Sequence, residues 1–157
     1  MPEELPVEDV MPILEMEGDD EEETDRLREL AELAADHLTE YPWFKSIREF
    51  FFGDGIGGVF AVFLAQLETT RSEKDEFVWV VVGDLPFGIQ PVDELKNPKA
   101  ALEAHIKKLR TWVKLLRQGE STEGVIPADI PASPEWAEAL NLRLDIIQLQ
   151  IIPAWFA

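Results

Sequence analysis

The sequence predicts an α+β protein in which a long antiparallel β-hairpin, forming a small sheet, packs against three to four helices. Two apolar runs rich in β-branched and aromatic residues, Gly58–Glu68 and Phe77–Gly83, flank the polar segment Thr69–Glu76, a pattern typical of a hairpin. Other segments repeat apolar residues at spacings of three and four, which indicates amphipathic helices. With 157 residues, of which 46% are hydrophobic, the chain is long enough to bury a substantial core.

The first segment is an acidic arm, residues 1–23, which holds 11 acidic residues and no Lys or Arg. Runs of like charge repel one another, so a solvated tail is the simplest interpretation. In the alternative, apolar residues of the arm dock on a groove, although Pro12 interrupts a continuous helix there. We therefore predict an arm over residues 1–23 and a single α+β domain over residues 24–157.

The first helix is predicted from Thr24 to about Thr39, with Thr24 as its N-cap and leucines on its buried face. The short stretch Ser46–Phe52 that follows is compatible with either a helix or a strand. A second face of the predicted helix carries a row of carboxylates. A solvated face explains the row, since a metal site would need the Glu-x-x-His spacing, which His37 does not supply. The row consists of Glu29, Glu32, Asp36 and Glu40.

A glycine-rich stretch, Gly53–Gly58, matches the pattern G-x-G-x-x-G. A dinucleotide site requires a strand before such glycines, a helix after them and an acidic residue that ends the next strand, a position that Asp84 could fill. The following run Val59–Leu64 is rich in β-formers and is a poor helix opening. We prefer a bend that leads into a strand, and keep nucleotide binding as the alternative.

The central strand is predicted at Phe77–Val82, because both of its faces are apolar. It ends at Gly83-Asp84-Leu85-Pro86, where proline has no N–H to donate. An irregular segment is expected over Phe87–Leu95.

The next helix is predicted to begin at Pro98 with Asn97 as its N-cap and to end at Gly119. Beside its apolar stripe lies a row of basic residues. Solvated cations near a helix C-terminus are the simplest interpretation of this row. A docking site for the acidic arm or for an anionic ligand is the alternative. The row consists of Lys107, Arg110, Lys114 and Arg117.

The last helix is predicted to open at Ser133-Pro134 and to be stopped by Pro153. Its polar edge is narrow, so it lies in the core or is covered by a second molecule, which allows a homodimer through this helix. A strand over Leu142–Ile152 is the competing prediction, since apolar residues also alternate there.

Several of these motifs together resemble a family of small bacterial domains of unknown function. In that family a strand containing tryptophan ends in G-D-L-P, as Trp79–Pro86 does here, and is followed by a helix start like Asn97-Pro98-Lys99-Ala100-Ala101. Pro42-Trp43 is similar to the P-x-W segment of the family. The resemblance spans about residues 41–118 and implies no activity, cofactor or functional residue.

As an enzyme the chain is poorly equipped, so we favour a protein that is not an enzyme and that needs no cofactor or metal. A small hydrolase or nucleotide-binding enzyme that uses Gly53–Gly58 and Asp84 is the alternative. It has no cysteine, two histidines and one tyrosine, and no serine in a nucleophile elbow. Only Asp54 and Asp84 lie in glycine-bearing apolar surroundings, so a hydrolase would use these two carboxylates.

The charge pattern points instead to protein binding. The formal net charge is −18, which disfavours direct contact with a nucleic acid and favours a basic protein partner. We expect an acidic module such as an immunity protein against a toxin, an antitoxin, or an inhibitor that imitates nucleic acid. The predicted partner-binding residues are Glu15, Glu17, Asp19, Asp20, Glu21, Glu22, Glu23, Glu29, Glu32 and Asp36.

The same composition suggests a location. The absence of cysteine favours an intracellular protein, and no apolar run approaches the roughly 20 residues that cross a bilayer. We therefore expect a cytoplasmic protein without a membrane contact.

Overall fold

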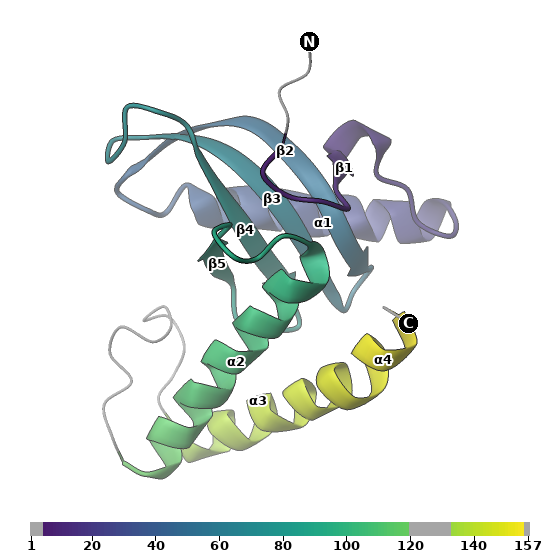
Figure 1. The fold of residues 1–157 in the computed structure, drawn as a ribbon. Coiled ribbons are helices and arrows are strands. Elements are labelled where there is room, and N and C mark those ends of the chain that lie inside the picture. Colours follow the sequence, from purple (N-terminus) through teal and green to yellow (C-terminus); the bar gives the residue numbers. More distant parts are fainter. Residues whose placement is uncertain (1–4, 120–132, 156–157) are drawn as a thin grey trace. The chain divides into compact units, whose positions relative to one another are not determined.

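The structure is a computed structural model that describes residues 5–119 and 133–155 (Figure 1). The predicted α+β class is confirmed by a five-stranded antiparallel sheet accompanied by helices. In chain order the elements are β1 (Met11–Pro12), a 3₁₀ turn (Ile13–Glu15), α1 (Glu21–Leu38), β2 (Phe44–Ile56), β3 (Phe60–Thr69), β4 (Glu76–Gly83), β5 (Gly88–Pro91), α2 (Pro98–Arg117), α3 (Pro134–Ile146), a π-helical turn (Ile147–Ile151) and α4 (Ile152–Trp155).

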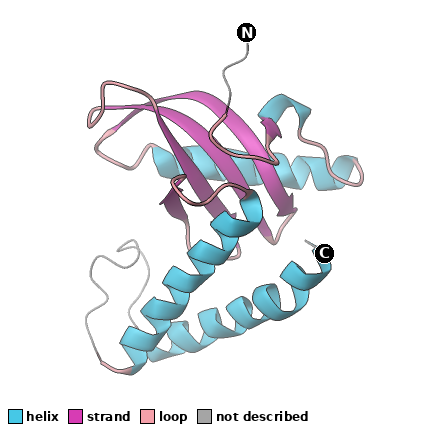
Figure 2. Cartoon of the chain, viewed as in Figure 1, coloured by secondary structure: helices cyan, strands magenta, loops and turns pink. Residues whose placement is uncertain are grey.

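The strands, magenta in Figure 2, form one sheet with the simple order β1-β2-β3-β4-β5, so that each strand pairs with its neighbours in the chain. The predicted hairpin is the β3–β4 pair, whose register runs from Phe60 opposite Gly83 to Leu67 opposite Glu76. Its strand β4 lies between β3 and β5, as its two apolar faces predict. The ambiguous stretch before the glycines is the long strand β2, and the segment expected to be irregular contains β5.

Helix α1 covers one face of this sheet. Side chains that alternate along β3, including Phe63 and Leu67, form a core with Leu27 and Leu38 of α1. The predicted start of this helix at Thr24 is wrong, because Asp20 caps it four residues earlier: its Oδ1 accepts a hydrogen bond of 2.8 Å from the N–H of Glu23. Thr24 is instead buried in the first turn.

The described part of the acidic arm is tied to the sheet. Met11 and Pro12 pair with Phe52 and Phe51 of β2, and the N–H of Glu8 donates to the carbonyl oxygen of Lys96 at 2.7 Å. Val7 and Met16 are buried, and residues 21–23 already belong to α1.

Contacts along the chain separate two units, residues 1–101 and residues 102–157, and we describe each by itself. Helix α2 begins in the first unit with the predicted cap, since Asn97 Oδ1 accepts from the N–H of Ala100 at 2.8 Å. At its other end Gly119 has φ +70°, a conformation that suits glycine at a helix C-terminus.

The C-terminal segment is helical, so the competing strand over residues 142–152 is wrong. Ser133 caps α3 as predicted, with its Oγ accepting from the N–H of Trp136. The expectation that Pro153 stops the helix is also wrong, because α4 continues through it. A π-helical turn ends at Ile151, two residues before this proline, which has no N–H for the helical ladder. The apolar residues Leu142, Ile146 and Leu149 are exposed along this segment.

Candidate functional site

The most distinctive surface of the first unit is a row of carboxylates on α1. Glu29, Glu32 and Asp36 are exposed, and the spacing of three and four residues places them on one helix face. No ion pair joins them to another side chain within the described part of the chain. Leu33 lies in this face with 42% of its surface exposed. We call these three carboxylates and Leu33 the acidic face of α1.

The other predicted partner-binding acids divide into two groups. Three serve the fold: Asp20 caps α1, Glu23 accepts a hydrogen bond of 2.6 Å from the N–H of Gly57, and Glu22 pairs with Arg26 at 2.6 Å. Four are exposed around the start of α1 and form no ion pair with described residues: Glu15, Glu17, Asp19 and Glu21.

The charge of this region is strongly one-sided. Residues 15–40 contain twelve Asp or Glu and two Arg, a net charge of −10 without His37. Both arginines lie beside carboxylates of their own helix, Arg26 beside Glu22 and Arg28 beside Asp25. The acidic face has no such neutralisation, so its negative potential extends into solvent.

The predicted basic row on α2 is partly committed to contacts with α3. Arg110 donates to Asn141 and Gln148 and pairs with Asp145 at 2.8 Å. Arg117 pairs with Glu138 at 2.6 Å. Lys107 and Lys114 are exposed. Two of the four cations therefore hold α2 and α3 together within the second unit.

The glycine-rich stretch has a structural explanation. Gly53 and Gly55 lie inside β2, and the chain turns into β3 rather than into the helix that a dinucleotide site requires. A Cβ at Gly55 would lie 2.7 Å from the carbonyl oxygen of Phe60, and Gly58 has φ +80° in the turn. Close strand packing and a tight turn account for these glycines.

The two candidate catalytic carboxylates are held in different parts of the sheet. Asp54 belongs to β2, opposite Val62 of β3, and its Oδ1 accepts from the N–H of Gly55 at 2.8 Å. Asp84 follows β4, is exposed, and donates its N–H to the carbonyl oxygen of Val59 at 2.7 Å. Strand β3 lies between them, so the structure does not bring them together as a carboxylate pair.

A stacked cluster that sequence patterns do not reveal lies near the end of α1. His37 stacks on Phe87, Tyr41 stacks on Trp43, and the guanidinium of Arg71 lies 3.6 Å from the centre of the Trp43 ring. Arg71 also donates to Glu76, whose pKa it lowers; burial acts in the opposite direction, and a hydrogen bond from Thr69 lowers the pKa further. The cluster joins the start of β2 to the β3–β4 turn.

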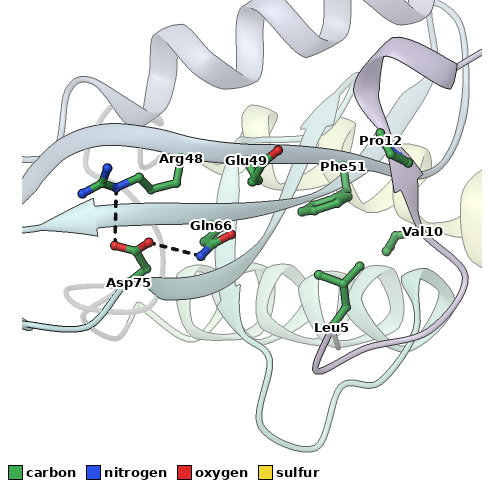
Figure 3. Close-up of a pocket in the computed structure, with 8 residues that line it drawn as sticks. All are labelled: Leu5, Val10, Pro12, Arg48, Glu49, Phe51, Gln66 and Asp75. Atoms are coloured by element: carbon green, nitrogen blue, oxygen red, sulfur yellow. Dashed lines mark hydrogen bonds and ion pairs between the residues drawn. The ribbon is translucent and has the colours of Figure 1, made fainter. Parts of the chain in front are cut away.

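A cavity of about 760 Å³ was also missed by sequence reasoning (Figure 3). It is lined by side chains of the N-terminal segment, β1, β2, β3 and the β3–β4 turn. Its lining residues are Leu5, Val10, Pro12, Arg48, Glu49, Phe51, Gln66 and Asp75. Only the tertiary structure brings Leu5 and Val10 next to Phe51, which explains why no local pattern signals the cavity.

Over residues 5–119 and 133–155, no group of three or more His, Asp or Glu side chains is arranged to hold a metal ion. No helix in these ranges has both the length and the apolar character to cross a membrane.

In comparisons with known proteins, no family model, no curated protein and no solved structure matches the chain.

Proposed function

We propose that the protein binds a basic protein partner through the acidic face of α1. The observation that supports this is the exposed row Glu29, Glu32 and Asp36, which has no cation opposite it among the described residues. An inhibitor of a nucleic-acid-binding protein, or an immunity protein against a basic toxin, is the corresponding biological role.

The physical argument concerns association rate and selectivity. An excess of one sign of charge on a surface attracts the opposite surface at a distance and raises the association rate by about 10 to 1,000 fold. Leu33 adds an apolar contact at the edge of the face, one turn after Glu29. Because isolated surface ion pairs contribute only about 0 to 1 kcal/mol each, such a contact is needed for a lasting complex.

The experiment identifies the partner by capture from cells that make the protein and then measures association of the two purified proteins. We expect the association rate to fall at least about tenfold between about 50 and 500 mM NaCl, as screening removes the attraction. The triple variant Glu29→Gln, Glu32→Gln, Asp36→Asn should slow association by about tenfold at low salt.

A matched control removes the same charge elsewhere on the first unit. Glu73, Asp93 and Glu94 are exposed, and the variant Glu73→Gln, Asp93→Asn, Glu94→Gln should slow association much less. An association rate that is independent of salt, or an equal effect of the two triple variants, would contradict the proposal.

A further inference from the structure

The cavity described above lies on the face of the sheet that is turned away from α1. Glu49 pairs with Gln66 and Phe51 pairs with Leu64 in the β2–β3 register, and directly opposed residues of antiparallel strands share a face. The core side chains that meet α1 belong to the alternate positions Phe63, Ala65 and Leu67. The cavity is therefore separate from the acidic face of α1.

The two ends of the cavity differ in chemistry. At one end Leu5 and Val10 lie beside Phe51, and at the other Arg48 and Asp75 lie near Gln66 (Figure 3). A cavity with one apolar and one polar end selects a group that is itself amphipathic.

The polar end carries an excess of negative charge. Arg48 is shared between two carboxylates, at 2.8 Å from Glu68 and 3.7 Å from Asp75. Gln66 donates to Asp75 at 3.1 Å. Glu49 is exposed and forms no ion pair with the described residues. The lining of the cavity thus contains two carboxylates, Glu49 and Asp75, and one guanidinium, which Glu68 outside the lining also engages, so a cation from a ligand would balance the exposed charge of Glu49.

The outer edge of β2, on the side away from β3, lies beside the cavity. This edge favours an extended peptide chain as the carrier of the cation. In the described ranges β1 is the strand that pairs with this edge, and it covers only Phe51 and Phe52 (Figure 1). The next residues, Glu49 and Phe50, pair regularly with β3, and a register shift follows between Glu49 and Ile47. An edge of this kind presents main-chain N–H and C=O groups to a further strand.

We propose that the cavity and the adjoining edge of β2 bind an extended segment of the basic partner, in which Lys or Arg lies close to an apolar side chain. The basic side chain meets Glu49, and the apolar one enters between Leu5, Val10 and Phe51. This inference rests on the proposed function, because the segment belongs to the same partner.

The test uses the full chain and a defined peptide, Ac-Leu-Thr-Lys-Thr-Leu-NH₂, whose Lys and Leu side chains share one face when extended. When the protein is titrated with this peptide and followed by amide NMR, the signals of Glu49, Phe50 and Gln66 should shift. Glu49→Lys should weaken binding by about tenfold. The matched variant Glu94→Lys, which makes the same change at an exposed residue outside both the cavity and the acidic face, should leave peptide binding unchanged.

Peptide variants keep the test independent of protein folding. Replacing the peptide Lys by Glu, or both Leu by Ser, should abolish measurable binding. Equal binding of these peptides, or shifts confined to α1, would overturn the inference. So would phenethylamine binding as tightly as the peptide, which would indicate a small-molecule site. A dimer in sedimentation that Glu49→Lys or an excess of the peptide dissociates would assign the edge to a second copy instead of the partner.

The two proposals can fail separately. If the peptide does not bind but the triple variant of α1 still slows partner association, only the cavity assignment is wrong. If the peptide binds as described but the variants of α1 have no effect on partner association, the acidic face is not the docking surface.

Discussion

At the residue scale, Glu76 shows how one carboxylate stabilises a turn. Its carboxylate accepts from Arg71 Nε at 2.9 Å and from the Thr69 hydroxyl at 2.6 Å, and its side chain is 26% exposed. These hydrogen bonds hold the pKa of Glu76 below its ordinary value of 4.5 in the folded state, and the one from Arg71 has the largest effect. A lowered folded pKa stabilises the protein above the unfolded pKa, and this stabilisation is lost as pH falls through the folded pKa.

We therefore expect Glu76→Gln to lower the free energy of unfolding by about 1 to 2 kcal/mol at pH 7, because the hydrogen bonds then involve a neutral group. The difference from the wild type should shrink below about pH 4.5 and approach zero in stronger acid. Urea unfolding at a series of pH values measures it. Glu73→Gln, in the same turn, should have little effect at any pH, and a pH-independent loss for Glu76→Gln would contradict the argument.

At the element scale, α1 depends on Asp20 for its start. The carboxylate satisfies the N–H of Glu23, and Thr24 reinforces the turn by donating to the carbonyl oxygen of Asp20 at 2.9 Å and accepting from the N–H of Gly18 at 2.9 Å. An N-cap of this kind contributes about 1 kcal/mol.

Asp20→Ala should thus lower the free energy of unfolding by about 1 kcal/mol, whereas Asp20→Asn, which keeps the acceptor, should change it by only a few tenths. Urea unfolding followed by circular dichroism measures both. Asp19→Ala removes the same charge from an exposed neighbour and should have a smaller effect. If Asp19→Ala and Asp20→Ala destabilise equally, the loss reflects charge rather than capping.

The elements that the sequence predicts well are those specified by local chemistry. The β3–β4 hairpin follows from two apolar runs around a polar turn, and the starts of α2 and α3 follow from a cap before proline. Strand β2 is ambiguous in the sequence because three shifts in its register with β3 disturb its alternation. Helix α1 was predicted to start too late because Thr24 and Asp20 are both good caps, and only tertiary packing buries Thr24.

The candidate functional surfaces also differ in how far the sequence alone predicts them. The carboxylates of the acidic face could be placed from their helical spacing in the sequence. The structural role of Glu23 could not, since Glu23 bonds to Gly57, which lies 34 residues away. The cavity was also invisible, because it joins Leu5 and Val10 to three strands through long-range pairing.

At the scale of the whole molecule, the formal net charge of −18 implies self-repulsion in the folded state. The few ion pairs of the acidic region lie within α1 and leave the acidic face unneutralised among the described residues. Carboxylates three and four residues apart on a helix repel one another by about 0.2 to 0.5 kcal/mol per pair. Repulsion within the acidic face is therefore expected to lower the stability of the fold, a cost that fits the proposed binding role.

This repulsion predicts how salt affects the stability of the triple variant Glu29→Gln, Glu32→Gln, Asp36→Asn. At low salt the variant should be more stable than the wild type by about 0.5 to 1 kcal/mol, because two repelling pairs and their long-range repulsion are removed. The difference should shrink near 500 mM NaCl, where the Debye length is only about 4 Å. Thermal unfolding followed by circular dichroism measures both quantities. A variant that is less stable than the wild type at low salt would mean that these carboxylates support the fold, and the main argument for a binding role of the acidic face would be lost.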